Sequence, residues 1–138
     1  MILHLETSTK ICSVALSKNG ELFDFIETSS DQFIHGEQLT VMIDQLLKRN
    51  STDIKSLLAI SFSLGPGSYT GLRIGLATAK GLSFGLGIPF IGVSSLESLV
   101  SLARAKHPDA TIAAAFDARR DEVFLRIQQQ NKVLLMDQ

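Results

Sequence analysis

A glycine-rich segment, Gly65–Gly75, separates an apolar run, Leu57–Phe62, from a helix-length segment, Leu72–Leu86. A strand that leads through a glycine-rich turn into a helix is a common phosphate-binding geometry, because free backbone N–H groups lie at the positive end of the helix dipole. The residues match neither familiar phosphate loop. A P-loop ends in Gly-Lys-Ser/Thr, and the dinucleotide-binding motif has a glycine where Thr70 stands. The segment therefore predicts a strand, a turn and a helix without assigning a phosphate ligand.

The predicted helix carries small residues at four-residue spacing along one side. Each glycine inside a helix costs about 1 kcal/mol relative to alanine, so we expect a close approach by another segment to compensate. Two interpretations stay open. Either the stripe packs on the chain's own sheet or neighbouring helix, or a helix of a second protein lies along it. The stripe consists of Gly71, Gly75, Ala79 and Ser83, with Gly81 and Gly85 as further small residues.

Composition excludes several classes of protein. The chain has 138 residues, 45% of them hydrophobic, which is enough for one full core and the beginning of a second. A formal net charge of −1 leaves no electrostatic signature of direct nucleic-acid binding. The single cysteine, Cys12, excludes an internal disulfide and is typical of a reducing compartment. No apolar run reaches the roughly 20 residues that cross a bilayer, so we expect a cytoplasmic protein.

Turn and capping signals predict the order of the elements. Asn19-Gly20 predicts a tight hairpin, because both residues accept the positive φ of a type I′ turn. Ser94-Ser95-Leu96-Glu97 is a capping box, which predicts a helix that ends before Pro108. A polar loop precedes the first helix, whose predicted buried face is Leu39, Met42, Ile43 and Leu46. The predicted strands are Ile2–Thr7, Ile11–Ser17, Glu21–Glu27, Leu57–Ser63 and Pro89–Val93, and the first two helices are His35–Lys48 and Leu72–Leu86.

This order is that of the ribonuclease H-like fold, an α/β arrangement with a mixed sheet flanked by helices. The C-terminal residues repeat the opening pattern of strand, turn, strand, turn and strand. In this repeat, Asp117 holds the position that Glu6 holds in the first pattern. Duplicated halves of this kind are typical of the actin, sugar-kinase and heat-shock ATPase superfamily. We therefore expect a domain over 1–109 and the opening strands of a truncated second domain over 110–138, formed by Thr111–Phe116, Glu122–Ile127 and Lys132–Met136.

Five segments together resemble the bacterial TsaB (YeaZ) family: Leu5–Thr9, Gly65–Gly75, Ala79–Leu82, Ile91–Glu97 and Asp117–Arg119. The resemblance implies a role in forming N6-threonylcarbamoyladenosine next to the anticodon of tRNA. It implies that the chain is a noncatalytic scaffold for its paralogue TsaD, that the ATPase TsaE joins through the complex, and that tRNA is contacted only indirectly. Members of the family are usually longer, so the resemblance also implies a truncated second half.

Metal and nuclease chemistry lack their ligands in this sequence. The TsaD paralogue carries a His-x-x-x-His pair, whereas the matching positions here are Ser95 and Leu99. The three histidines, His4, His35 and His107, lie far apart in sequence, and we expect ordinary surface or capping roles and no metal site. A two-metal nuclease needs converging carboxylates, yet no Asp or Glu occurs from position 57 to position 96.

The residues Glu6, Thr7, Ser8 and Thr9 allow two interpretations. They are a vestigial nucleotide loop in which Glu6 organises magnesium, or they are a polar hairpin tip whose hydroxyls satisfy their own backbone. Because the superfamily's nucleotide cleft lies between two complete halves, we expect weak or no ATP binding and no cofactor. An ATP-binding or ATP-hydrolysing protein remains the first alternative function, and a glycoprotease-like peptidase is the second.

The partner surface predicted from the sequence is one side of the glycine-rich helix. Arg73 and Lys80 are two turns apart and share a helix face, either as solvated charges or as partners for acids on a second protein. We expect TsaD to dock here, and a homodimer to form in the isolated chain. Replacing Gly75 with a bulky residue is expected to abolish partner binding and to leave the fold largely intact. The predicted interface comprises Gly71, Leu72, Arg73, Gly75, Leu76, Ala79, Lys80 and Ser83.

Overall fold

The computed structural model describes residues 1–29 and 35–136. They form three α-helices and eight strands, and the strands make two sheets. The polar loop expected before His35 lies outside these residues. The strands are β1 (Ile2–Glu6), β2 (Ile11–Lys18), β3 (Glu21–Ser29), β4 (Ala59–Gly65), β5 (Phe90–Ser94), β6 (Thr111–Arg119), β7 (Glu122–Gln129) and β8 (Lys132–Leu135). The helices are α1 (His35–Arg49), α2 (Tyr69–Leu86) and α3 (Ser95–Lys106), with a 3₁₀ turn at Ile54–Ser56.

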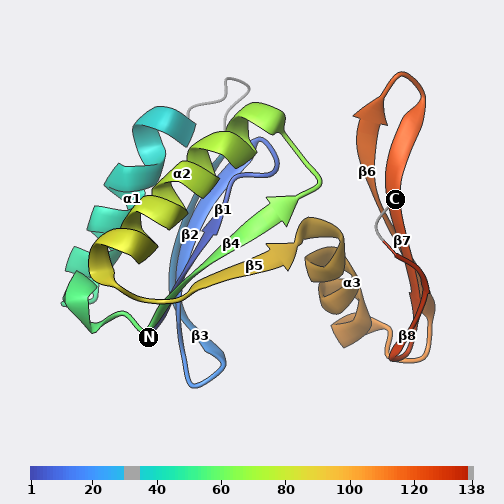
Figure 1. The fold of residues 1–138 in the computed structure, drawn as a ribbon. Helices are drawn as coiled ribbons and strands as arrows, with labels where there is room; N and C mark the ends of the chain where they lie inside the picture. Colours follow the sequence, from blue (N-terminus) through green and yellow to red (C-terminus); the bar gives the residue numbers. More distant parts are fainter. Residues whose placement is uncertain (30–34, 137–138) are drawn as a thin grey trace.

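The larger sheet has five strands in the order β3-β2-β1-β4-β5. Strands β1, β4 and β5 run parallel to one another. On the other side of β1, strand β2 pairs antiparallel with β1, and β3 pairs antiparallel with β2. Helices α1 and α2 lie side by side over one face of this sheet (Figure 1). The mixed sheet and its covering helices confirm the predicted fold class.

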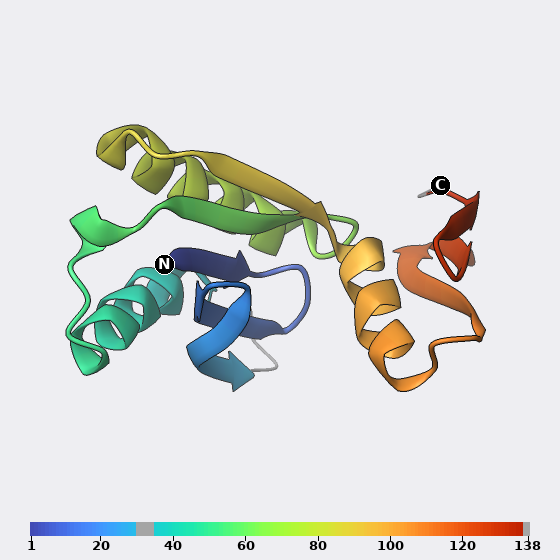
Figure 2. The same cartoon turned by 90° about the horizontal axis from the view of Figure 1, so that it is seen from below.

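The smaller sheet, β6-β7-β8, is an antiparallel meander, as β1-β2-β3 is in the larger sheet. Helix α3 lies between the two sheets and contacts β4 and β5 on one side and β6 and β7 on the other (Figure 2). Leu96 and Val100 of α3 pack with Ile112 and Ala114 of β6 in a small separate core. The predicted repetition of the opening strand pattern is therefore present in the fold.

Local signals place the first hairpin and the start of α3 as predicted, whereas α2 starts earlier than predicted. Asn19 and Gly20 adopt φ values of 55° and 84°, which are the positive values that a type I′ hairpin requires. The Ser94 side chain accepts a hydrogen bond from the Glu97 N–H at 3.2 Å, so the capping box does start α3. Helix α2 begins at Tyr69 rather than Leu72, because the Ser68 hydroxyl caps it by accepting from the Gly71 N–H.

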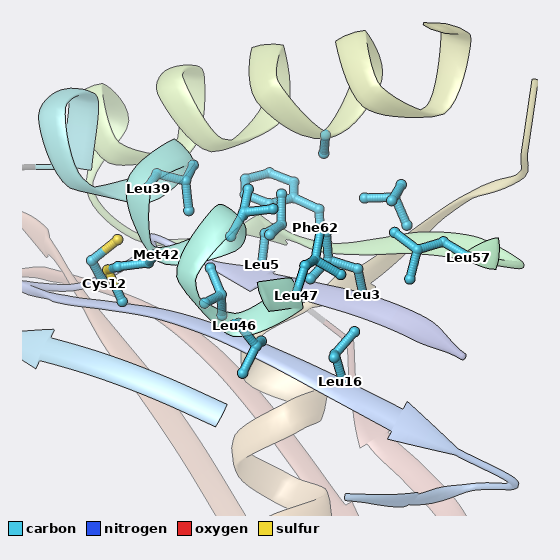
Figure 3. Packing of buried hydrophobic residues seen from close by; sticks show 14 residues of the cluster. Leu3, Leu5, Cys12, Leu16, Leu39, Met42, Leu46, Leu47, Leu57 and Phe62 are labelled. Atoms are coloured by element: carbon cyan, nitrogen blue, oxygen red, sulfur yellow. The ribbon is translucent and has the colours of Figure 1, made fainter. Parts of the chain in front are cut away.

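The main core lies between the larger sheet and helices α1 and α2 (Figure 3). The predicted buried face of α1 is confirmed, since Leu39, Met42, Ile43 and Leu46 are all buried. Phe62 of β4 is the largest of the fully buried side chains and lies beneath α2. Among the described residues, no helix combines the length and the apolarity that crossing a membrane requires.

Candidate functional site

The glycine-rich segment and the turn after β1 are in direct contact, although the sequence presents them as separate motifs. The Ser68 N–H donates to the Ser8 carbonyl at 2.6 Å, and the Thr7 hydroxyl donates to the Gly71 carbonyl at 2.8 Å. A Cβ at Gly67 would lie 2.6 Å from the Cβ of Ser8 and 2.9 Å from its Cα. Gly67 therefore allows the backbones of the two segments to approach closely. The glycine-rich segment and the turn after β1 together form one structural unit.

The polar groups of the Glu6–Thr9 turn are used within the chain. One carboxylate oxygen of Glu6 accepts from the Ser8 N–H at 2.6 Å, and the other accepts from the hydroxyl of Ser63 on β4. The Thr9 hydroxyl accepts from the Ile11 N–H at 3.1 Å. The bonds to the Ser8 and Ile11 N–H groups are those by which a hairpin tip satisfies its own backbone, and the bond from Ser63 ties the turn to β4.

This unit forms one wall of an open cleft of about 760 Å³. The opposite wall comes from β6 and β7 of the smaller sheet, including Asp117 and Phe124. Asp117, which holds the position of Glu6 in the repeated strand pattern, lies across the cleft from the turn after β1. Lys10 and Phe124 were not predicted as site residues, and no local motif marks them, because Phe124 reaches this cleft only when the second sheet folds back.

The small-residue stripe on α2 faces the chain's own sheet. Gly71, Gly75 and Ala79 are buried, and a Cβ at Gly75 would collide with the Thr7 hydroxyl and with the Phe62 ring, whose Cζ would lie 2.9 Å away. The interpretation that a second polypeptide lies along these three residues is therefore corrected. Their small size lets α2 pack closely over β1 and β4, which is the self-packing interpretation of the stripe.

The outer surface of α2 carries different residues. Arg73 and Lys80 are both exposed, as their spacing predicts, and the Arg73 guanidinium lies 5.4 Å from the centre of the Tyr69 ring. Phe84 is 91% exposed, and a Cβ added at Gly81 or Gly85 would meet no atom within 4 Å. We call the exposed residues Arg73, Ala77, Lys80, Gly81, Phe84 and Gly85 the outer face of α2.

The remaining predicted interface residues are half-buried. Leu72 and Leu76 pack against the main core, and the Ser83 hydroxyl donates to the Ile88 carbonyl at 2.6 Å at the end of the helix. These three side chains therefore support α2 on the sheet and contribute only part of their surface to its outside.

The histidines differ in part from the expectation of surface or capping roles. His107 is the exposed C-cap of α3, but His4 is half-buried in β1 with its Nε2 atom 2.7 Å from the Ser17 hydroxyl. Burial lowers the pKa of His4 below its ordinary value of 6.5, so the ring is neutral at pH 7. The side chain of His35 lies outside the described structure. Among the described residues, no three His, Cys, Asp or Glu side chains converge as metal ligands would.

Cys12 carries no signature of a reactive thiol. It is buried on β2, and burial, followed by the negative charge of Glu6, raises the pKa of the thiol to about 11. The thiolate is therefore scarce at neutral pH.

Comparison with known proteins identifies relatives along nearly the whole chain. Residues 30–136 match the family described as TsaD, tRNA N6-adenosine threonylcarbamoyltransferase. The chain is 37% identical over 132 residues to the tRNA threonylcarbamoyladenosine biosynthesis protein TsaB of Haemophilus influenzae, and 36% identical over 123 residues to that of Escherichia coli. These alignments cover 96% and 89% of this chain, respectively.

Among solved structures, YeaZ from Pseudomonas aeruginosa superposes with a TM-score of 0.88 at 33% identity, over 99% of this chain and 65% of that one. The chain spans about half the length of the curated relatives it matches, 55% of the Haemophilus influenzae protein and 52% of the Escherichia coli protein. The fold thus superposes on that of a solved relative over nearly the whole chain. The chain belongs to the TsaD family of tRNA N6-adenosine threonylcarbamoyltransferases, and within it to the TsaB (YeaZ) group.

Proposed function

We propose that the chain is a noncatalytic subunit that supports TsaD in forming N6-threonylcarbamoyladenosine in tRNA. The observation that carries this proposal is the match to proteins named TsaB over 96% of the chain. TsaE would join through the complex, tRNA would be contacted only indirectly, and the place of action would be the cytoplasm. The net charge of −1 agrees with an indirect role towards tRNA.

A noncatalytic role agrees with the chemistry of the described residues. Glu6 and Thr7 use their polar atoms in bonds to Ser8, Ser63 and Gly71. Strand β4 and helix α2 contain no carboxylate that could hold a metal ion or act as a general base.

The test is reconstitution of threonylcarbamoyl transfer with TsaD and TsaE from the same organism. The modification should require this chain, and equal product in its absence would contradict the proposal.

We place TsaD docking on the outer face of α2. This surface combines an almost fully exposed aromatic ring, two cations and glycines whose Cα atoms a partner helix could approach closely. Of the residues predicted from the sequence, Arg73 and Lys80 lie on this face and Leu72, Leu76 and Ser83 support it from within. Gly71, Gly75 and Ala79 act only indirectly, by holding the helix on its sheet.

Replacing Phe84 with aspartate is expected to weaken TsaD binding at least tenfold, because it puts a charge in the centre of an apolar contact, an effect of about 1.4 kcal/mol or more. Titration calorimetry with purified TsaD measures this. Phe23→Asp is the matched control: Phe23 follows the alternation of β3 to the side opposite Asp24, whose carboxylate binds Arg49 of α1. Loss of binding in F23D with full binding in F84D would place the contact on the other face of the sheet.

We expect magnesium and ATP to give little heat when titrated into the isolated chain. The reason is that the Glu6 carboxylate already accepts two hydrogen bonds, from the Ser8 N–H and the Ser63 hydroxyl, and lies outside the lining of the open cleft between the two sheets. Saturable micromolar binding that disappears in Glu6→Gln would favour the ATP-binding alternative instead. Threonylcarbamoyl transfer and ATP titration thus separate the two functions.

A further inference from the structure

The tip of the β2–β3 hairpin carries a reactive dipeptide that lies apart from the cleft. Asn19 is the only asparagine of the chain that a glycine follows, since Asn50 precedes serine and Asn131 precedes lysine. The tip lies at the end of the larger sheet opposite the turn after β1 (Figure 1). Chemistry at this tip is therefore independent of the groups that line the cleft.

The reacting groups of Asn19 and Gly20 are accessible and unbonded. Both residues are exposed, and neither the Asn19 side chain nor the Gly20 N–H makes a hydrogen bond within the described part of the chain. A Cβ added at Gly20 would meet no atom within 4 Å. Because glycine has no side chain, its backbone nitrogen is open to approach by the side chain that precedes it.

The closed hairpin holds this tip by a short exposed ladder. The pairing of β2 with β3 is irregular between Leu16 and Ser17. Every residue from 18 to 23 is exposed. Short ladders with few buried contacts open at little cost in free energy, so Asn19 can rotate out of the closed turn. The residue pairs beyond the irregularity are Ser17 with Leu22 and Lys18 with Glu21.

We propose that Asn19 is a site of spontaneous deamidation, with Gly20 as the attacking residue. The Gly20 backbone nitrogen forms a bond to the Asn19 Cγ atom, and the Cγ–Nδ2 bond breaks. The side-chain amide leaves as ammonia and takes the proton of the Gly20 nitrogen. Water then opens the resulting succinimide at either of its carbonyl carbons, which gives aspartate or isoaspartate. The overall step consumes water, releases ammonia and involves no oxidant or reductant.

Isoaspartate disturbs the hairpin more than aspartate does. It routes the backbone through Cβ and so adds a methylene to a turn that requires positive φ at both of its residues. Either product adds a negative charge next to Glu21, in a chain whose formal net charge is −1. The last buried residue of β2 is Leu16, so the main core is not touched. We expect the tip to open and the fold to persist.

The other two asparagines are internal controls. The Asn50 side chain donates to the Asp24 carboxylate at 2.6 Å and to the Leu46 carbonyl at 2.9 Å, which holds its amide in place. Asn131 is exposed between β7 and β8, but Lys132 follows it, and a side chain on the following residue hinders the attack. Asn131 therefore matches Asn19 in exposure and differs from it in the residue that follows.

Incubation of the chain at neutral to weakly alkaline pH, followed by peptide mass mapping, measures amide loss at all three asparagines in one sample. Loss at Asn19 should be roughly tenfold faster than at Asn131 or more, a difference of about 1.4 kcal/mol in the barrier. Loss at Asn50 should be slower still. An isoaspartyl methyltransferase with labelled S-adenosylmethionine should detect isoaspartate in the tip peptide, which direct hydrolysis of the amide does not produce.

Two variants identify the attacking group. Gly20→Ala puts a Cβ beside the attacking nitrogen and should slow the loss at Asn19 roughly tenfold, and its urea unfolding midpoint shows that the chain stays folded. Asn19→Gly keeps a residue that accepts positive φ and should abolish the isoaspartate signal in this peptide. Faster loss at Asn131 than at Asn19, a tip product without isoaspartate, or an unchanged rate in G20A would overturn the proposal.

Discussion

Replacing Gly75 with alanine is expected to destabilise the protein by about 2–3 kcal/mol, a large effect for one added methyl group. The new Cβ would meet the Thr7 hydroxyl and the Phe62 ring, both of which lie in the main core. Neither neighbour is the free end of a flexible side chain, because Thr7 is tied to the Gly71 carbonyl and Phe62 is packed under α2. Helix α2 would have to lift from the sheet, and the midpoint of urea unfolding measures the cost.

The matched control is the same substitution on the same helix at Gly81. A Cβ there meets no atom within 4 Å, so Gly81→Ala is expected to stabilise the protein by about 0.5–1 kcal/mol through helix propensity alone. Equal unfolding midpoints for the two variants would show that Gly75 is not closely packed. This expectation reverses the prediction made from the sequence, in which a bulky residue at Gly75 left the fold largely intact.

Replacing Phe62 with alanine is expected to cost about 3–5 kcal/mol, because it removes the largest fully buried side chain and leaves a cavity that the sheet and helix cannot fill. Phe62 is 2% exposed and lies where β4 meets α2. Thermal or urea unfolding measures the loss. The control is Phe25→Ala on β3, where 48% of the side chain is exposed and a much smaller effect is expected.

The two sites are expected to be coupled. In the double variant F62A/G75A, the alanine at position 75 loses its collision with the ring, so the total destabilisation should fall below the sum of the two single effects. A simple sum would mean that the two side chains do not share space. The cycle thus tests the packing of α2 independently of each single value.

Signals confined to a few neighbouring residues were read correctly from the sequence. The positive φ values at Asn19 and Gly20, the capping box at Ser94 and the buried face of α1 each depend on local backbone chemistry or on helical periodicity. The order of these elements was sufficient to predict the sheet, because few topologies accommodate three antiparallel strands followed by alternating helices and strands.

The candidate site was only partly predictable. Glu6 and the glycine-rich segment were both singled out, but their contact through Ser8 and Ser68 joins segments far apart in the chain. Lys10 and Phe124 carry no motif, and they share a cleft only because the second sheet folds back towards the first. The pairing of His4 with Ser17 likewise depends on the register of β1 and β2.

The amino-acid order by itself determined the elements, the α/β class and the family, because these follow from periodicity, turn chemistry and motifs that are local in the chain. Only the tertiary structure decided which side of α2 is inside. A row of small residues identifies a helix face that packs closely against another segment, but the row itself does not show which segment that is. Here it is Thr7 from the turn after β1 and Phe62 from β4, and the outer face is left to Arg73, Lys80 and Phe84.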